Sequence, residues 1–269
     1  MPIPVLRVGS KGDLVERWQT FLRGLDLYTG PVDGVFGVST DAATRALQRR
    51  ANSEGRDFVV DGIAGNQTIG YAMTLGFEVV EHAAPDDDEN GPDWPPPPSD
   101  LSAISSADRD RIFGHLAWEP APVGGNPEAI RITNGFDRDN IVTVGIPQLI
   151  RVLGAPKSGR VAVHRLAAAP ITAVFAQWEE AGLDTKILAW AGSWAPRLIR
   201  GSTTTLSNHA YGTAFDINAP WNALGARPAL KPQKGSVREL VRIANEHGWF
   251  WGGHFSARKD GMHFELARV

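Results

Sequence analysis

The chain has 269 residues, with 27 Lys and Arg against 30 Asp and Glu, and a formal net charge of −3. This balance gives no general attraction to nucleic acid or to anionic membranes, so we expect neither as a partner. Cysteine is absent, which excludes disulfides and thiolate ligands. No stretch approaches the ~18–20 apolar residues of a membrane span. The length predicts two domains, and we expect a monomer.

A repeated turn marks the first 80 residues. The segment DGVFGVST, which begins at Asp33, recurs as DGIAGNQT from Asp61. The glycines of each copy permit a tight turn, and each copy leads into a segment with helical spacing of apolar residues. Helices are predicted over residues 11–25, 39–50 and 66–75, which gives an all-α, three-helix module.

The pattern resembles the peptidoglycan-binding domain found beside many wall hydrolases. The resemblance implies that residues 1–82 are a wall-binding module and that bacterial peptidoglycan is the partner. The turns lack the alternating acidic ligands and terminal glutamate of an EF-hand, which argues against calcium loops. A merely structural helical repeat stays open as the alternative.

Residues 83–100 read AAPDDDENGPDWPPPPSD, an acidic run followed by a proline run. The acidic run cannot bury itself, and the prolines favour an extended polyproline helix, so we predict a semi-rigid spacer. Trp94 is expected to pack on one of the domains. The spacer implies that residues 1–82 form an independent module that holds a catalyst near an insoluble substrate.

Residues 101–269 predict an α+β domain. Helices are predicted over residues 107–116, 170–181 and 236–247, the last opened by a capping box of Ser236 and Glu239. Short strands are predicted over residues 187–191, 213–218, 249–251 and 262–266. The last three of these strands would form a small antiparallel sheet.

Two segments near the C-terminus carry residue types that bind metals. The segment SNHAYGTAFDIN contains His209 and Asp216, and the segment DGMHFEL contains His263. Two imidazoles and one carboxylate are a standard ligand set for a catalytic zinc ion, which keeps its fourth position open for water. If the segments converge in space, the chain is a metal-dependent hydrolase.

Strand alternation supports this convergence. Residues two apart share a face of a strand, so Asp216 would point away from the core while Phe215 points into it. Asp260 lies out of phase with His263, so we place it in the turn that enters the strand. There it would approach the open side of the metal instead of binding it. His209 is expected in a loop before its strand.

These two segments, with GWFWGG at residues 248–253, resemble the zinc D-alanyl-D-alanine carboxypeptidase / L-alanyl-D-glutamate endopeptidase family. Those enzymes cut the stem peptides of bacterial peptidoglycan. The resemblance runs from Ala191 to Leu266. It implies that Zn²⁺ is the cofactor and that His209, Asp216 and His263 are its ligands.

The resemblance also implies three further roles. Asp260 would be the catalytic base. An arginine would stabilise the oxyanion, and we favour Arg197 over Arg200. Ser207 matches a family serine with a supporting role.

The sequence departs from the family pattern at two positions. Gly261 stands where many members have proline or a bulkier residue, which is expected to loosen the approach of Asp260. His254 stands where an aspartate is frequent, so an exchange of ligand roles is left open. One or two tryptophans are expected to line a substrate groove, from the set Trp190, Trp194, Trp221, Trp249 and Trp251.

The predicted function is zinc-dependent hydrolysis of peptide bonds in stem peptides by an L-alanyl–D-glutamate endopeptidase of the phage endolysin type. The position of Asp260 three residues before His263, and the Trp-Gly-Gly segment, favour that branch. The alternatives are a D-alanyl-D-alanine carboxypeptidase in wall remodelling and a non-catalytic wall-binding protein. The first eleven residues contain no apolar segment of a secretory signal. We therefore expect synthesis in the cytoplasm and action on the cell wall, after host lysis in an endolysin.

Overall fold

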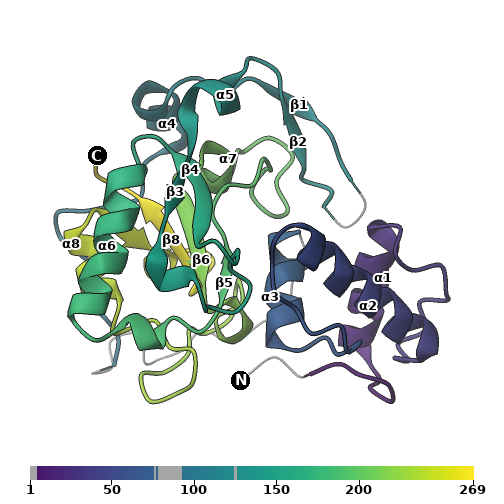
Figure 1. Cartoon of the computed structure of the whole chain (residues 1–269). Coiled ribbons are helices and arrows are strands. Elements are labelled where there is room, and N and C mark those ends of the chain that lie inside the picture. The colour runs from purple at the N-terminus through teal and green to yellow at the C-terminus, as the bar shows by residue number, and fades with distance from the viewer. Residues whose placement is uncertain (1–4, 76, 78–92, 124–125) are drawn as a thin grey trace.

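The computed structural model describes residues 5–75, 77, 93–123 and 126–269 (Figure 1). The acidic part of the predicted spacer, residues 83–92, lies outside the described residues. A helical N-terminal part and a larger part built on strands and helices lie side by side (Figure 1). None of the described helices is both long and apolar enough to cross a membrane.

The N-terminal part contains α1 (Asp13–Gly24), α2 (Val38–Ser53) and α3 (Asn66–Thr74). Their apolar faces meet in one core, which includes the fully buried Trp18 and Leu47. The helices begin and end within three residues of their predicted bounds.

A buried glutamine from the preceding helix holds each repeated turn. The side-chain amide of Gln19 donates to Asp33 Oδ1 at 2.9 Å, and its oxygen accepts the backbone N–H of Asp33. Gln48 repeats the arrangement, donating to Asp61 Oδ1 at 2.8 Å and accepting the backbone N–H of Gly62. The carboxylate of each aspartate is thus occupied by hydrogen bonds that hold its turn. This is expected for a structural turn and not for a calcium-binding loop.

The larger part is α+β. Its helices are α4 (Ser106–Phe113), α5 (Phe136–Asn140), α6 (Ala168–Glu180), α7 (Asn208–Tyr211) and α8 (Val241–Glu246). Two antiparallel pairs join β1 (Trp118–Pro120) to β2 (Ile130–Ile132) and β3 (Ile141–Gly145) to β4 (Arg160–His164). A four-stranded antiparallel sheet has the order β5 (Trp190–Gly192), β6 (Ala214–Ile217), β8 (His263–Leu266), β7 (Trp249–Trp251).

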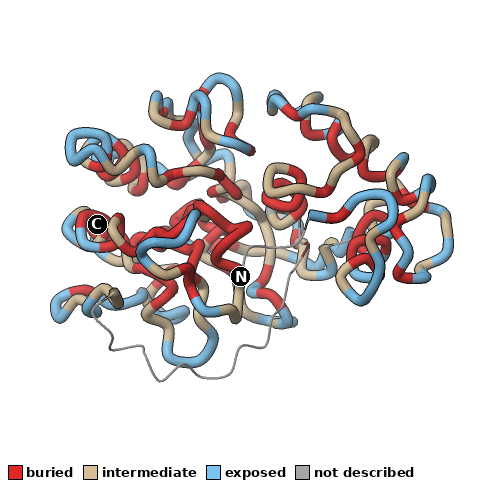
Figure 2. The backbone as a smooth tube through the Cα atoms, turned by 90° about the horizontal axis from the view of Figure 1, so that it is seen from below, coloured by how far each residue is buried: buried red, intermediate tan, exposed pale blue. Residues whose placement is uncertain are grey.

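Aromatic side chains fill the core behind the four-stranded sheet. Phe215 of β6 lies with its ring 4.8 Å from Trp249 and 5.4 Å from Phe264. Trp178 of α6 is fully buried and donates its indole N–H to the carbonyl of Leu240. Figure 2 shows this run of buried backbone through the part that holds the C-terminus. The burial of this aromatic surface stabilises β6 and β8, and so fixes the positions of the side chains on the opposite face of these strands.

The predicted capping box is wrong. The Ser236 hydroxyl donates to the carbonyl of Ala229, and the carboxylate of Glu239 pairs with Lys186 at 2.7 Å. The Ser236 oxygen accepts the backbone N–H of Arg238 at 3.4 Å, and the reciprocal bonds to Glu239 that define a capping box are not found among the described residues; α8 begins only at Val241.

The two parts of the molecule are in direct contact. The backbone N–H of Lys157 donates to the carbonyl of Gly55 at 3.0 Å, and the guanidinium of Arg56 donates to the carbonyl of Gly154. Ala223 of the larger part belongs to the apolar core of the N-terminal part. The N-terminal module is therefore docked, and not held apart by a spacer as the sequence suggested.

The described end of the predicted spacer also lies on the larger part. The ring of Trp94 is 5.2 Å from that of Trp251, and the guanidinium of Arg238 lies over it at 5.0 Å. The expectation that Trp94 packs on a domain is confirmed.

Candidate metal centre

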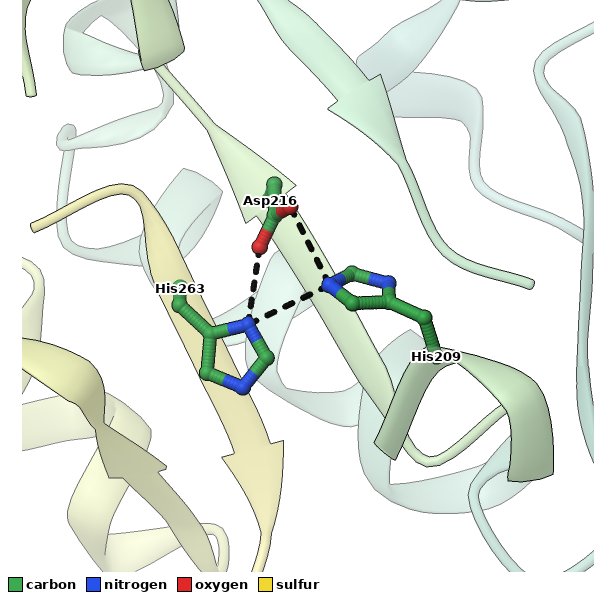
Figure 3. Close-up of side chains that lie close together, drawn as sticks. All are labelled: His209, Asp216 and His263. Atoms are coloured by element: carbon green, nitrogen blue, oxygen red, sulfur yellow. Dashed lines mark hydrogen bonds and ion pairs between the residues drawn. The ribbon is translucent and has the colours of Figure 1, made fainter. Parts of the chain in front are cut away.

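Three side chains from three elements meet beside the four-stranded sheet (Figure 3). His209 comes from α7, Asp216 from β6 and His263 from β8. The register of the antiparallel pair places Asp216 directly opposite His263, and such cross-strand partners are close neighbours.

His209 lies on a short helix and not in a loop as the sequence suggested. The Ser207 hydroxyl caps α7 by accepting the backbone N–H of His209 at 3.2 Å. Gly212 ends the helix with a φ of +71°, and a Cβ there would lie 2.7 Å from the backbone nitrogen of His164. Ser207 and Gly212 together fix the turn that carries His209.

The three facing atoms have the spacing of a small-ion site. His209 Nε2 lies 3.2 Å from His263 Nδ1 and 3.1 Å from Asp216 Oδ2, and His263 Nδ1 lies 2.9 Å from Asp216 Oδ1. Ligand atoms about 2.1 Å from a tetrahedral zinc ion are about 3.4 Å from one another. The residues present therefore fit Zn²⁺ with only a small outward movement.

Both imidazoles are oriented for binding by hydrogen bonds on their far sides. His209 donates its Nδ1–H to the carbonyl of Ser193 at 2.6 Å, which leaves Nε2 facing the other two groups. His263 donates its Nε2–H to Glu265, which also accepts from the side chain of Asn208, so Nδ1 faces inward. Such partners fix the tautomer of a metal-binding histidine.

Glu265 orients a ligand, a role that was not predicted from the sequence. The signal was present, since Glu265 follows His263 by two residues in a strand and so shares its face.

Burial and neighbouring charges set the protonation of the cluster. Burial is the main reason that the pKa of His209 is lowered, which favours the neutral imidazole that a metal needs. Burial opposes ionisation of Asp216, but the two imidazoles outweigh it and lower the pKa of this carboxyl. Burial likewise opposes the charged form of His263, yet hydrogen bonds to Asp216 and Glu265 raise its pKa to about 10. The carboxylates of Asp216 and Glu265 thus favour a positive charge at the position of the His263 ring between them.

Asp260 lies in the turn before β8, as predicted. Its backbone N–H donates to the carbonyl of Gly252 at 3.0 Å, and burial raises the pKa of its carboxyl to about 7. Its Oδ1 atom is buried and has no hydrogen-bond partner among the residues that the structure describes. Buried polar atoms are nearly always paired, so this one indicates a functional role for the carboxyl group.

Comparison with known protein families agrees with this geometry. A family model described as D-alanyl-D-alanine carboxypeptidase matches residues 200–266, which include His209, Asp216, Asp260 and His263. The chain carries a peptidase domain of this family. A second model, of a peptidoglycan binding domain, matches residues 11–70. A search of curated proteins found no match.

The two domains together make the protein a metallopeptidase that acts on peptidoglycan. The peptidase family depends on zinc, and the cluster of His209, Asp216 and His263 is a possible site for the ion.

Glycines shape the approach to Asp260 in the peptidase domain. A Cβ on Gly252 would lie 2.6 Å from the carbonyl oxygen of Asp260 and 3.1 Å from the Cβ of His263. A Cβ on Gly261 would lie 2.8 Å from the Cβ of Pro228. The expectation that Gly261 loosens this turn is therefore wrong, because its backbone is closely packed.

Replacing Gly252 by alanine should impair catalysis, because the new methyl group displaces both Asp260 and His263. Displacements on the 1 Å scale cost on the order of 100-fold in rate, so we expect a loss of about that size in kcat. Gly145→Ala is the matched control, since no atom of the described residues would lie within 4 Å of a Cβ there. Steady-state kinetics on a soluble stem peptide measure the difference. Equal rates for both variants would contradict this role of Gly252.

The two candidate arginines occupy different surroundings. Arg197 lines the cavities on both sides of the cluster, and its charge acts on both His209 and Asp260. Arg200 is 8% exposed, and its guanidinium pairs with Glu128 at 2.8 Å. Arg200 lines the cavity on the Asp260 side as well, and the preference for Arg197 stays a prediction.

His254 is turned toward the end of the predicted spacer. Its Nε2–H donates to the carbonyl of Pro95 at 2.9 Å, and its ring packs against Trp94 and Trp251. It is not part of the cluster formed by the described residues, so nothing in the structure supports an exchange of ligand roles.

The tryptophans divide between groove and core. Trp190 and Trp194 line a cavity beside the cluster. Trp249 and Trp251 are fully buried in the aromatic core, and Trp221 packs in a separate small cluster. Trp190 is only 2% exposed, however, and its ring stacks on Phe215 in the core, so Trp194 is the one of the five that is partly exposed beside the cluster. One groove tryptophan lies within the one or two that were expected.

Two cavities flank the metal cluster. One, of about 400 Å³, is lined by Asp216 and lies partly against the N-terminal module. The other, of about 360 Å³, is lined by Asp260 and His263. His209 and Arg197 line both, so the cluster has room for substrate on two sides.

Glu265→Gln should weaken zinc binding, because an amide orients the His263 ring less strongly than a carboxylate does. Losing such a partner costs ~10–100-fold in metal affinity. Competition with a chromophoric chelator measures the affinity. Glu246→Gln, which changes an exposed carboxylate on α8, is the control. An unchanged affinity for Glu265→Gln would show that Asn208 and the strand alone orient His263.

Proposed function

We propose that the protein hydrolyses peptide bonds in peptidoglycan stem peptides with a Zn²⁺ ion held by His209, Asp216 and His263. One observation carries the proposal: the three ligand atoms lie within 4.8 Å of one another, with both imidazoles turned toward the same point. A bound zinc ion would supply a Lewis acid and an acidified water molecule at that point.

The remaining chemistry falls to three side chains. Asp260 accepts the proton of the attacking water and passes it to the leaving amine, for which its unpaired Oδ1 atom is available. Arg197 places positive charge beside the oxyanion that forms, and stabilisation of this kind is worth on the order of 3 kcal/mol. Ser207 positions His209 by capping α7.

We propose further that the bond is internal, as in an L-alanyl–D-glutamate endopeptidase. An endopeptidase must accommodate chain on both sides of the bond that it cuts. The cavities of about 400 and 360 Å³ on the two sides of the cluster support this assignment.

A D-alanyl-D-alanine carboxypeptidase is the second candidate. It agrees with the description of the matching family. Arg258 lines the cavity on the Asp260 side, where a guanidinium would suit the terminal carboxylate of such a substrate.

Digestion of purified sacculi tests these assignments. Mass spectrometry of the products identifies the new termini. New N-terminal D-glutamyl groups are expected, whereas release of free D-alanine would favour the carboxypeptidase. Metal analysis of the same preparation should find about one zinc per chain. A protein that holds no zinc and releases no product would be a non-catalytic wall-binding protein.

The organisation that we propose has residues 1–82 as the wall-binding module, built on α1, α2 and α3, residues 83–100 as the connection and residues 101–269 as the peptidase. We propose that the chain is a monomer, which sedimentation tests. An endolysin role stays a prediction. Lysis of intact cells by protein added from outside, compared with cells whose outer layer is permeabilised, tests it.

A further inference from the structure

The larger cavity beside the metal cluster belongs to both domains. From the peptidase domain it receives Asp216, Arg197 and Arg160. From the N-terminal module it receives Arg50 and Glu54 at the end of α2, among others. Anchoring to the wall alone would not require the module to line the catalytic cleft. Its position there is consistent with a direct contact with substrate.

Further contacts between the two domains hold the walls of this cleft in place. Lys157 binds the carbonyl of Gly55 through its backbone and Asp57 through its ammonium group at 3.2 Å. A Cβ on Gly70 of α3 would lie 3.8 Å from the ring of Pro220, an ordinary packing distance. The cleft is therefore a built feature of the docked molecule.

The charged side chains of this cleft are mainly basic. Arg160 is exposed at the start of β4 and has no ion pair among the described residues. Arg50 pairs with Glu54 at 3.2 Å, but both side chains are 42% exposed, and exposed pairs of this kind are weak. Both guanidinium groups therefore remain available to an anionic ligand.

We propose that this cleft is a substrate subsite shared by the two domains, in which Arg50 of the wall-binding module and Arg160 of the peptidase domain bind a carboxylate of the stem peptide. The proposal rests on the peptidase function proposed above. Guanidinium groups bind carboxylates through paired hydrogen bonds, which suits recognition of an acidic peptide. Arg50 is then a specificity-determining residue that lies outside the peptidase domain.

Kinetics of the full-length zinc enzyme test the proposal with two probes. The probes are a soluble stem peptide that contains L-alanyl-γ-D-glutamate with a free carboxylate, and the same peptide with that carboxylate amidated. Arg50→Ala and Arg160→Ala should each raise KM for the acidic peptide about tenfold, the size expected for losing a charge-assisted hydrogen bond, with little change in kcat. Both variants should leave KM for the amidated peptide within about twofold of wild type.

Matched controls separate this effect from a general loss of positive charge. The control variants are Arg49→Ala and Arg151→Ala. Arg49 is next to Arg50 on α2, and Arg151 precedes β4. Both side chains are exposed, and neither is among the residues that line the cleft. Both controls should behave as wild type. Melting temperatures equal to wild type confirm that all four variants fold.

The outcomes distinguish the two proposals. An unchanged KM for the acidic peptide in Arg50→Ala and Arg160→Ala, or an equal rise for the acidic and amidated peptides, overturns the shared subsite. Equal effects in the control variants overturn it too. A zinc-loaded wild-type enzyme that cleaves neither peptide would instead contradict the proposed function.

Discussion

Replacing Asp260 by alanine should abolish hydrolysis while zinc stays bound. The carboxyl group lies beside the cluster and is not one of its three facing ligands, so the variant keeps the metal site and loses the base. General-base catalysis contributes ~10²–10⁴-fold, and we expect kcat to fall by at least that much. Rates on a soluble stem peptide and zinc content after dialysis are measured on the same sample.

Asp260→Asn is the companion variant, because it keeps the shape of the side chain and removes only the base. It should be as inactive as Asp260→Ala and should melt no lower than wild type, since it relieves a carboxyl group that burial disfavours in its charged form. Wild-type turnover in either variant would show that the base is another group. Glu265 or His254 would then be the next to test.

Replacing His263 by alanine should remove both zinc and activity. Only His209 and Asp216 would remain, and two ligands do not hold a zinc ion with useful affinity. The Asp216 carboxylate would also lose one of the two imidazoles that lower its pKa. Metal analysis after dialysis is expected to find almost no zinc, and the rate on stem peptide should fall to background.

His115→Ala serves as the control for the loss of a histidine, because His115 is exposed and pairs with Asp110 on the surface. It should keep full zinc content and full rate. A His263→Ala protein that retained stoichiometric zinc would remove His263 from the ligand set and would reopen the question of which side chains bind the ion.

Local patterns were enough to predict the sheet that carries the cluster. The alternation around Asp216 placed Phe215 in the core, where it is fully buried, and in the structure His263 and Glu265 share one face of β8 in the same way. The register of β6 and β8 then brings Asp216 opposite His263. Period-two patterns succeed here because one face of each strand packs against a large aromatic core.

Other features depend on contacts that no local pattern records. The four residues of α7 are too few for a helical period, so the caps at Ser207 and Gly212 decide that His209 is helical. Arg200 lines the cavity that holds Asp260, but its guanidinium is paired with Glu128, a partner 72 residues distant in sequence. The capping box at Ser236 failed for the same reason, because Lys186 holds Glu239.

The docking of the two domains was likewise invisible in the sequence. The proline-rich composition of residues 93–100 indicated separation, whereas Trp94 and the Lys157–Gly55 contact belong to a packed molecule. The composition of a segment indicates whether that segment can form a buried structure of its own. It does not indicate whether the two domains that it connects have complementary surfaces, and docking depends on those surfaces.

A docked binding module changes how the enzyme meets a solid substrate. A flexibly tethered catalyst samples many orientations and reaches any bond within the length of its tether. Here the contacts of Gly55 and Arg56 with the peptidase domain fix the cleft relative to the N-terminal module. Each time the module binds the polymer, the catalytic cleft then has one fixed orientation relative to it. The spacing between cuts along the wall should therefore be more regular than the spacing produced by a flexibly tethered enzyme.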